Sequence, residues 1–316
     1  MESLNRMATE LVDEALEFTD ELAIDAYELE TGTTVLDFGV EAIGGIEAGL
    51  LLTEIQTAGL ATVSTTMGTV DDTPRPMVEL TTDHPAFALL CSQKAGWELT
   101  VAEDDWRFDA LGSGPARALV ATEEEFRKLG YADAFEFAVL ALEAEQLPTE
   151  AVAEQVAQRC DVDTGQLFLP TVSMASMAGS TTMAARAAEL TTFRAFERGY
   201  DPLDVLSISA KAPLAPVAAS EPAAIARTND ALAYGGTVHL TVEQDAGAEL
   251  FGELISSAPS EYGDPFEVLF EAEDWQLEAL DPDVYGPAQV TVDVVGGPTY
   301  SFGERDDAVL AESFGL

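Results

Sequence analysis

Apolar residues at the start of the chain recur every three or four positions, with carboxylates between them. The positions concerned are Leu4, Met7, Leu11, Ala15, Phe18 and Leu22. This spacing predicts an amphipathic helix. It does not fit a secretion signal, because a charged start followed by a continuous apolar stretch is missing.

Further along, helical and extended patterns alternate without a strict period, which indicates a mixed α/β protein. Strict alternation predicts a strand in GGTVHLTV and another over 289–295. The other expected strands span 34–38, 60–65 and 86–92. The other expected helices span 123–144, 149–160 with Thr149 as the cap, and 182–199, which Gly199 ends. A small-residue stretch over 169–182 is the best candidate for a linker or for a wall that a neighbour approaches closely.

Length and charge add the next constraints. The 316 residues suit one large or two medium domains. The 58 acidic and 14 basic residues give a net charge of -44, yet 47% of the residues are hydrophobic, so the chain should fold. Only Lys94, Lys128 and Lys211 are lysines. Loss of lysine beside gain of carboxylates predicts a protein adapted to a salt-rich cytoplasm, where ions screen the surface repulsion.

The same charge excludes several partners. Nucleic acids and anionic membranes need clustered cations, and the chain has no basic stripe. No apolar run approaches the roughly 18 residues of a membrane span. Cys91 and Cys160 form no CxxC pair and are expected to be small buried residues, and His239 is expected to be a satisfied sheet residue. The phosphate-binding motifs of dinucleotide-binding and P-loop proteins are also missing.

Cations that persist in such a chain are candidates for function, which singles out Lys94, Arg117, Arg186 and Arg227. Arg186 and Glu189 are three residues apart, so one helix face would carry both. By spacing alone they form an ordinary surface ion pair worth about 0.2 to 0.5 kcal/mol. The alanines on either side of Arg186 favour a second interpretation, in which a flat ligand approaches this helix.

The segment GSGPAR offers a similar choice. It is either a plain turn, or a loop whose backbone N–H groups and Arg117 hold an anionic or polar ligand group. The candidate residues in this loop are Gly112, Ser113, Gly114 and Arg117.

Taken together, six motifs in order resemble the methenyltetrahydromethanopterin cyclohydrolase family. They are SQKAGW at 92–97, GSGPARAL at 112–119, RxxE at 186–189, APLAPV at 212–217, RTNDALAYGG at 227–236 and YGDPF at 262–266. The block DFGVEAIGGIEAG at 37–49 fits the start of the family's sequences. The resemblance runs from about residue 37 to about residue 288.

This resemblance implies hydrolysis of the 5,10-methenyl group of a tetrahydropterin to the 5-formyl form, with neither metal nor organic cofactor. It implies Glu189 as general base with Arg186 as its partner, and substrate contacts from Lys94, Arg227, Asn229 and Asp230 as well as from the GSGPAR loop. A cytoplasmic homotrimer is expected. Each subunit would have an α+β fold of two lobes, 1–170 and 171–316, with the ligand pocket between them. The alternative is a non-catalytic protein that binds a pterin or an anion.

Overall fold

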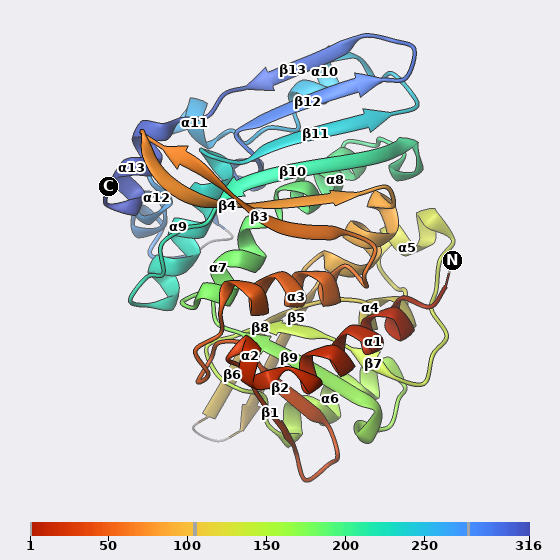
Figure 1. Ribbon diagram of the computed structural model, residues 1–316. Helices are drawn as coiled ribbons and strands as arrows, with labels where there is room; N and C mark the ends of the chain where they lie inside the picture. Colours follow the sequence, from red (N-terminus) through yellow and green to blue (C-terminus); the bar gives the residue numbers. More distant parts are fainter. Residues whose placement is uncertain (1, 104–105, 277–278) are drawn as a thin grey trace. The chain divides into compact units, whose positions relative to one another are not determined.

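The computed structural model describes residues 2–103, 106–276 and 279–316 (Figure 1). The chain divides into two compact units, each made of two segments. Unit 1 comprises the residues up to Ala61 together with Phe87–Gly179, and unit 2 comprises Thr62–Ala86 together with Ser180–Leu316. Each unit has its own sheet, which confirms the mixed α/β class. The lobe boundary near residue 170 stays a prediction.

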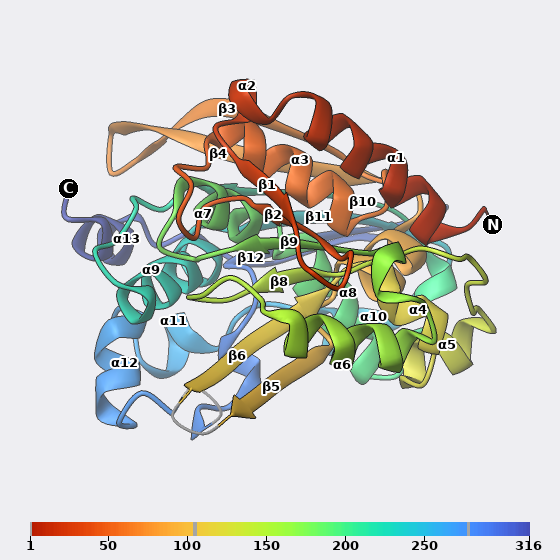
Figure 2. The same cartoon turned by 90° about the horizontal axis from the view of Figure 1, so that it is seen from below.

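Unit 1 is built on a seven-stranded sheet of order β1-β2-β9-β8-β6-β5, with β7 beside β9. Its strands are β1 (Asp25–Glu28), β2 (Thr34–Asp37), β5 (Trp97–Glu103), β6 (Trp106–Ser113), β7 (Ala138–Val139), β8 (Ala141–Glu143) and β9 (Leu167–Val172). Its helices are α1 (Leu4–Glu17), α2 (Thr19–Leu22), α3 (Ile46–Gln56), the π-helix η1 (Ala86–Gln93), α4 (Ala116–Val120), α5 (Glu124–Leu129), α6 (Glu150–Cys160) and η2 (Thr164–Gln166). Figure 2 shows α1 and α3 side by side on one face of this sheet and α6 on the other. Helices on both faces explain why β9, paired in parallel with β2 and β8, is almost entirely buried.

Unit 2 is built on a six-stranded sheet of order β13-β12-β11-β10-β4-β3, in which only the β11–β12 pair is parallel. Its strands are β3 (Thr62–Val70), β4 (Thr73–Thr82), β10 (Val205–Pro213), β11 (Thr237–Val242), β12 (Gln289–Val294) and β13 (Thr299–Gly303). Its helices are α8 (Ala187–Glu197), η3 (Pro202–Asp204), α9 (Glu221–Ala233), α10 (Gly247–Gly252), α11 (Ala258–Glu261), α12 (Phe266–Ala272), η5 (Pro282–Val284) and α13 (Asp307–Phe314). Helix α7 (Met177–Ala184) contains the point where the chain passes from unit 1 to unit 2. Burial alternates along β11 and β12, so their apolar side chains share the buried face of the sheet.

Two expected elements are wrong. Residues 86–92 form the π-helix η1 instead of a strand. Leu89 and Leu90 are completely buried there, and a short run of buried residues has no periodicity that separates strand from helix. The expected helix over 123–144 ends at Leu129, where Gly130 adopts a left-handed conformation, and the apolar residues that follow form β7 and β8.

The strands expected near Thr34, Thr62, Thr237 and Gln289 are confirmed, as is the helix that follows Thr149. Among the helices of the described chain, none is long and apolar enough to cross a membrane.

Candidate functional site

Arg186 and Glu189 lie at the start of α8 in unit 2. The helix expected over 182–199 is interrupted here, because the Arg186 N–H donates to Met183 O, three residues back, at 3.0 Å. Arg186 therefore occupies the N-cap position of α8 and Glu189 its first turn. A carboxylate in the first turn of a helix is stabilised by the helix dipole.

The two side chains form a buried ion pair. Arg186 Nη1 lies 3.4 Å from Glu189 Oε2, and each side chain is 4% exposed. This burial contradicts the interpretation of an ordinary surface pair. Ala184, Ala185 and Ala187, which were expected to leave room for a flat ligand, are buried as well. Because removing two charges from water is costly, the pair needs a reason beyond stability.

Arg194, about two turns further along α8, is a buried cation that the sequence motifs did not identify. Its guanidinium donates to five backbone carbonyls: Glu253 O at 3.4 Å, Pro282 O at 3.2 Å, Asp283 O at 3.1 Å, Tyr285 O at 2.5 Å and Ile255 O. Burial lowers the pKa of Arg194. The scarcity of cations in the sequence could have pointed to Arg194, but it was applied only to the four cations that lie in recognisable motifs.

Of the candidates on α9, Asp230 points into the core of unit 2. Its side chain accepts hydrogen bonds from Phe266 N at 2.8 Å and from the Ser313 hydroxyl at 2.6 Å. Burial raises the pKa of Asp230 to about 7, although both hydrogen bonds act in the opposite direction. Asn229 Nδ2 donates to Ile225 O within the same helix at 2.8 Å.

The third candidate on this helix, Arg227, helps to fix the loop that follows β10. Three consecutive carbonyls of this loop each accept a hydrogen bond from a different element. Leu214 O accepts from Arg75 of β4 at 3.3 Å, Ala215 O from Ser180 of α7 at 2.7 Å, and Pro216 O from Arg227 of α9 at 3.5 Å. The backbone of the motif APLAPV is therefore tied to β4, α7 and α9.

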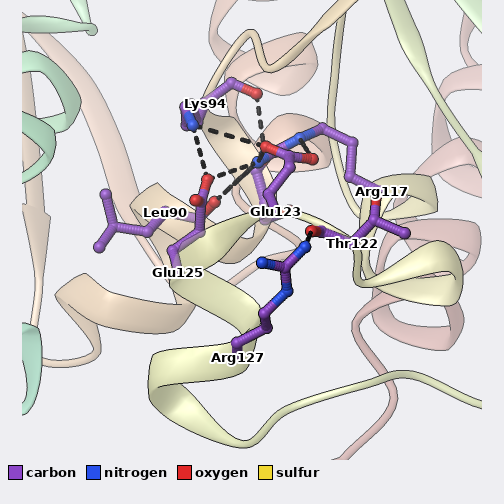
Figure 3. A network of polar contacts seen from close by, with 8 residues as sticks. Leu90, Lys94, Arg117, Thr122, Glu123, Glu125 and Arg127 are labelled. Carbon is purple, nitrogen blue, oxygen red and sulfur yellow. Dashed lines mark hydrogen bonds and ion pairs between the residues drawn. The ribbon is translucent and has the colours of Figure 1, made fainter.

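In unit 1, Lys94 and Arg117 meet two carboxylates (Figure 3). Lys94 Nζ lies 2.7 Å from Glu125 Oε1 and 3.5 Å from Glu123 Oε2. Arg117 Nη2 lies 2.5 Å from Glu123 Oε2 and 3.2 Å from Glu125 Oε1. Burial acts to raise the pKa of Glu123, but the hydrogen bond and charge of Arg117 outweigh it and hold that pKa below its usual value. Sequence reasoning missed both glutamates.

The GSGPAR segment packs against neighbouring parts of unit 1. The Gly114 N–H donates to Ser92 O at 2.7 Å, and the Ser113 hydroxyl accepts from Gln56 Nε2 at 2.9 Å. Gly114 has a φ of 111°, a conformation that favours glycine. A side chain at Gly112 would lie 3.3 Å from Leu140 and from Trp97. The structure thus brings the GSGPAR and SQKAGW segments together, and the Gly114 N–H is used by Ser92 O of the other segment.

Asp37 organises the loop that begins the N-terminal block. Its carboxylate accepts four backbone hydrogen bonds, from the N–H groups of Gly39 at 2.9 Å, Val40 at 2.6 Å, Glu41 at 2.9 Å and Ala42 at 2.8 Å. This is a structural use of a carboxylate that the sequence pattern did not reveal.

The cysteines and His239 agree with expectation. Cys91 and Cys160 are buried free thiols, and burial raises the pKa of each to about 12, so neither is a nucleophile at neutral pH. His239 Nε2 pairs with Asp293 on the adjacent strand at 2.9 Å. Within the described residues, no three His, Cys, Asp or Glu side chains form a group that could hold a metal ion.

Comparison with known proteins gives one consistent result. Residues 3–314 match the family described as Cyclohydrolase (MCH). A methenyltetrahydromethanopterin cyclohydrolase of Halobacterium salinarum is 61% identical over 316 residues, the full length of both chains. Proteins of the same name from Methanocella arvoryzae and Methanocorpusculum labreanum are 36% and 35% identical, over the whole of this chain and at least 99% of their own.

Proposed function

The chain belongs to the methenyltetrahydromethanopterin cyclohydrolase family and is a cyclohydrolase, and from this premise we propose that Glu189 and Arg186 carry out its hydrolysis step. The substrate is a methenyl derivative of tetrahydromethanopterin. The product is its 5-formyl form.

The chemistry requires a base and a route for one proton. The methenyl carbon belongs to a cationic amidinium and is already electrophilic, so water attacks it once a base removes a proton. Glu189 takes that proton, and a C–O bond forms at the methenyl carbon. The bond from this carbon to N10 then breaks, Glu189 returns a proton to N10, and the formyl group stays on N5. The remaining proton of the attacking water leaves to solvent. The net reaction therefore converts the cationic substrate into a neutral formyl group and releases one proton.

The observation that carries the proposal is the buried pair itself. Glu189 and Arg186 are 4% exposed each and 3.4 Å apart, so the carboxylate has a charged partner that orients it without surrounding water. A carboxylate also suits a cationic substrate, because a negative group stabilises the amidinium as it binds. Arg186 provides planar geometry, which lets one guanidinium hold the base and a ligand group together.

The finer predictions from the resemblance are part of the same proposal. Substrate contacts are assigned to Lys94, Arg227, Asn229 and Asp230, and to Gly112, Ser113 and Gly114 of the GSGPAR loop. The protein is expected to be a homotrimer of the cytoplasm.

The test is an assay of methenyl hydrolysis in molar salt, followed by loss of the methenyl chromophore. The wild type should turn over, and Glu189→Gln, which keeps the size but cannot accept a proton, should lower kcat by roughly 10²- to 10⁴-fold. Pterin binding should survive this change better than turnover. A variant rate within a few-fold of wild type would remove Glu189 as the base, whereas a wild type that binds the pterin without turnover would support the non-catalytic alternative.

A further inference from the structure

Arg117 uses its whole guanidinium inside unit 1. Nη1 contacts Lys94 O at 2.9 Å and both Leu90 O and Ser92 O at 3.2 Å, while Nε and Nη2 contact Glu123 at 3.1 and 2.5 Å. Its side chain is 0% exposed and lies over the ring of Phe126, with 5.5 Å from Cζ to the ring centre. A guanidinium in this position has no face left for a ligand.

Lys94 is held at both of its ends by the same arrangement. Its backbone carbonyl accepts from Arg117, and its ammonium is bound by Glu125, whose carboxylate also contacts Arg117. The hydrogen bonds therefore run from Arg117 through Glu125 to Lys94 Nζ (Figure 3). Exposure rises along this path, from 0% for Arg117 and 3% for Glu125 to 17% for Lys94.

The cluster is balanced in charge and closely packed. Two cations face two carboxylates, so no charge is left uncompensated in a region where an unpaired one would be costly. Gly96 leaves the space that the cluster needs, since a side chain there would lie 2.7 Å from Arg117 Nε and 2.9 Å from Arg117 Nη2. A flexible lysine chain gains a fixed position only when such partners restrict its rotamers.

We propose that Arg117 and Glu125, assisted by Glu123, are positioning residues that hold the Lys94 ammonium in place for the substrate. This rests on the proposed function in one respect, namely that Lys94 contacts the substrate. Arg117 is then not itself a substrate ligand. Glu123 and Glu125 serve to position Lys94, while the proposed general base is Glu189.

The experiment compares Lys94→Met, Glu125→Gln and the double variant in the hydrolysis assay, with Arg117→Lys as a further member. Glu124→Gln is the matched control, because it removes the same charge from the same helix at an exposed position. Lys94→Met and Glu125→Gln should each raise KM roughly 10-fold, the loss of about one charge-assisted hydrogen bond, with kcat within about twofold. In the Lys94→Met background, Glu125→Gln should raise KM no further, because it acts through a lysine that is gone. Arg117→Lys should raise KM similarly, since an ammonium cannot reproduce the fork of contacts.

Three results would overturn the proposal. In the first, the KM increases of Lys94→Met and Glu125→Gln multiply in the double variant, which would mean that Glu125 does not act through Lys94. Glu125→Gln could behave like Glu124→Gln while Lys94→Met raises KM. Lys94→Met could leave KM unchanged, which would place Lys94 away from the substrate. None of these bears on the base, because that role is judged by kcat of Glu189→Gln. If Arg117→Lys fails to fold, the Lys94 and Glu125 variants still decide.

Discussion

The Ser313 hydroxyl donates a hydrogen bond of 2.6 Å to the Asp230 carboxylate, across 83 positions of sequence. Because the other oxygen of Asp230 accepts from Phe266 N, one buried carboxylate joins α9, the start of α12 and α13. The C-terminal helix is thus fixed to unit 2 by a group whose charge is sensitive to pH.

Asp230→Asn should change how stability depends on pH. The pKa of Asp230 is raised from 3.8 to about 7 in the folded protein, so its favourable contribution is complete below about pH 4 and is lost as pH rises towards 7. The neutral amide of the variant has no such penalty, and its melting temperature minus that of wild type should therefore increase from pH 5 to pH 8. Since one pKa unit is about 1.4 kcal/mol, the change should be on the order of a few kcal/mol. Melting curves in high salt measure it, with Glu271→Gln at an exposed position of α12 as control. A difference that is flat with pH would contradict the prediction.

Arg186→Lys should lower kcat by roughly tenfold or more, because an ammonium cannot hold Glu189 and a ligand group with one planar fork. Turnover at saturating substrate, measured beside the melting temperature of the same variant, checks this. Near-native turnover would show that any cation suffices beside Glu189.

Arg194→Lys should destabilise unit 2 while leaving catalysis largely intact in the protein that remains folded. The variant cannot satisfy five carbonyls from two loops, and we expect a loss of roughly 3 kcal/mol in the free energy of unfolding. Arg198→Lys, one turn further along but exposed and paired only with surface carboxylates, should lose less than about 1 kcal/mol. Thermal or denaturant unfolding compares the two variants. An equal loss in the free energy of unfolding for both would show that the five carbonyl contacts of Arg194 do not stabilise unit 2.

Folding and activity should require salt. A net charge of -44 is screened over about 3 Å in 1 M salt but over about 10 Å in 0.1 M salt, so dilution strengthens repulsion among surface carboxylates. Dialysis to about 0.1 M salt should expand the protein and abolish turnover. Circular dichroism and activity that stay constant from about 0.1 to 3 M salt would refute adaptation to high salt.

The N-terminal helix shows what periodicity does and does not predict. The spacing predicted one helix up to Leu22, whereas the structure ends α1 at Glu17 and begins the short α2 at Thr19. The buried apolar stripe of α1 consists of Leu4, Ala8, Val12 and Ala15, and Phe18, which lies between the two helices, is 43% exposed. The buried stripe includes the small residues Ala8 and Ala15, and α1 packs against α3 and β7. Small side chains let elements pack closely, a demand that comes from the neighbouring elements and cannot be seen in the helix sequence itself.

The candidate site shows a similar division. Motif residues and scarce cations were enough to single out Arg186, Glu189, Lys94 and Arg117 as candidates, and the structure shows each of them in an ion pair. They did not identify Glu123 and Glu125, because in a chain with 58 acidic residues a glutamate carries no signal of its own. Only the fold brings these two carboxylates to the cations they bind.

The pairing of β4 with β10 has a consequence for synthesis on the ribosome. Thr82 pairs with Ile208, so the β3–β4 hairpin leaves the ribosome before the whole of segment 87–179 and must wait on the order of ten seconds for its partner strand. During that interval the edge of β4 that later binds β10 is open to other nascent chains. Pro74 and Pro76 lie in the part of β4 beyond the pairing with β10, so they cannot block this edge. Until the unit 2 sheet closes, crowding by other nascent chains therefore favours wrong strand pairing, and a chaperone that covers the β4 edge would prevent it.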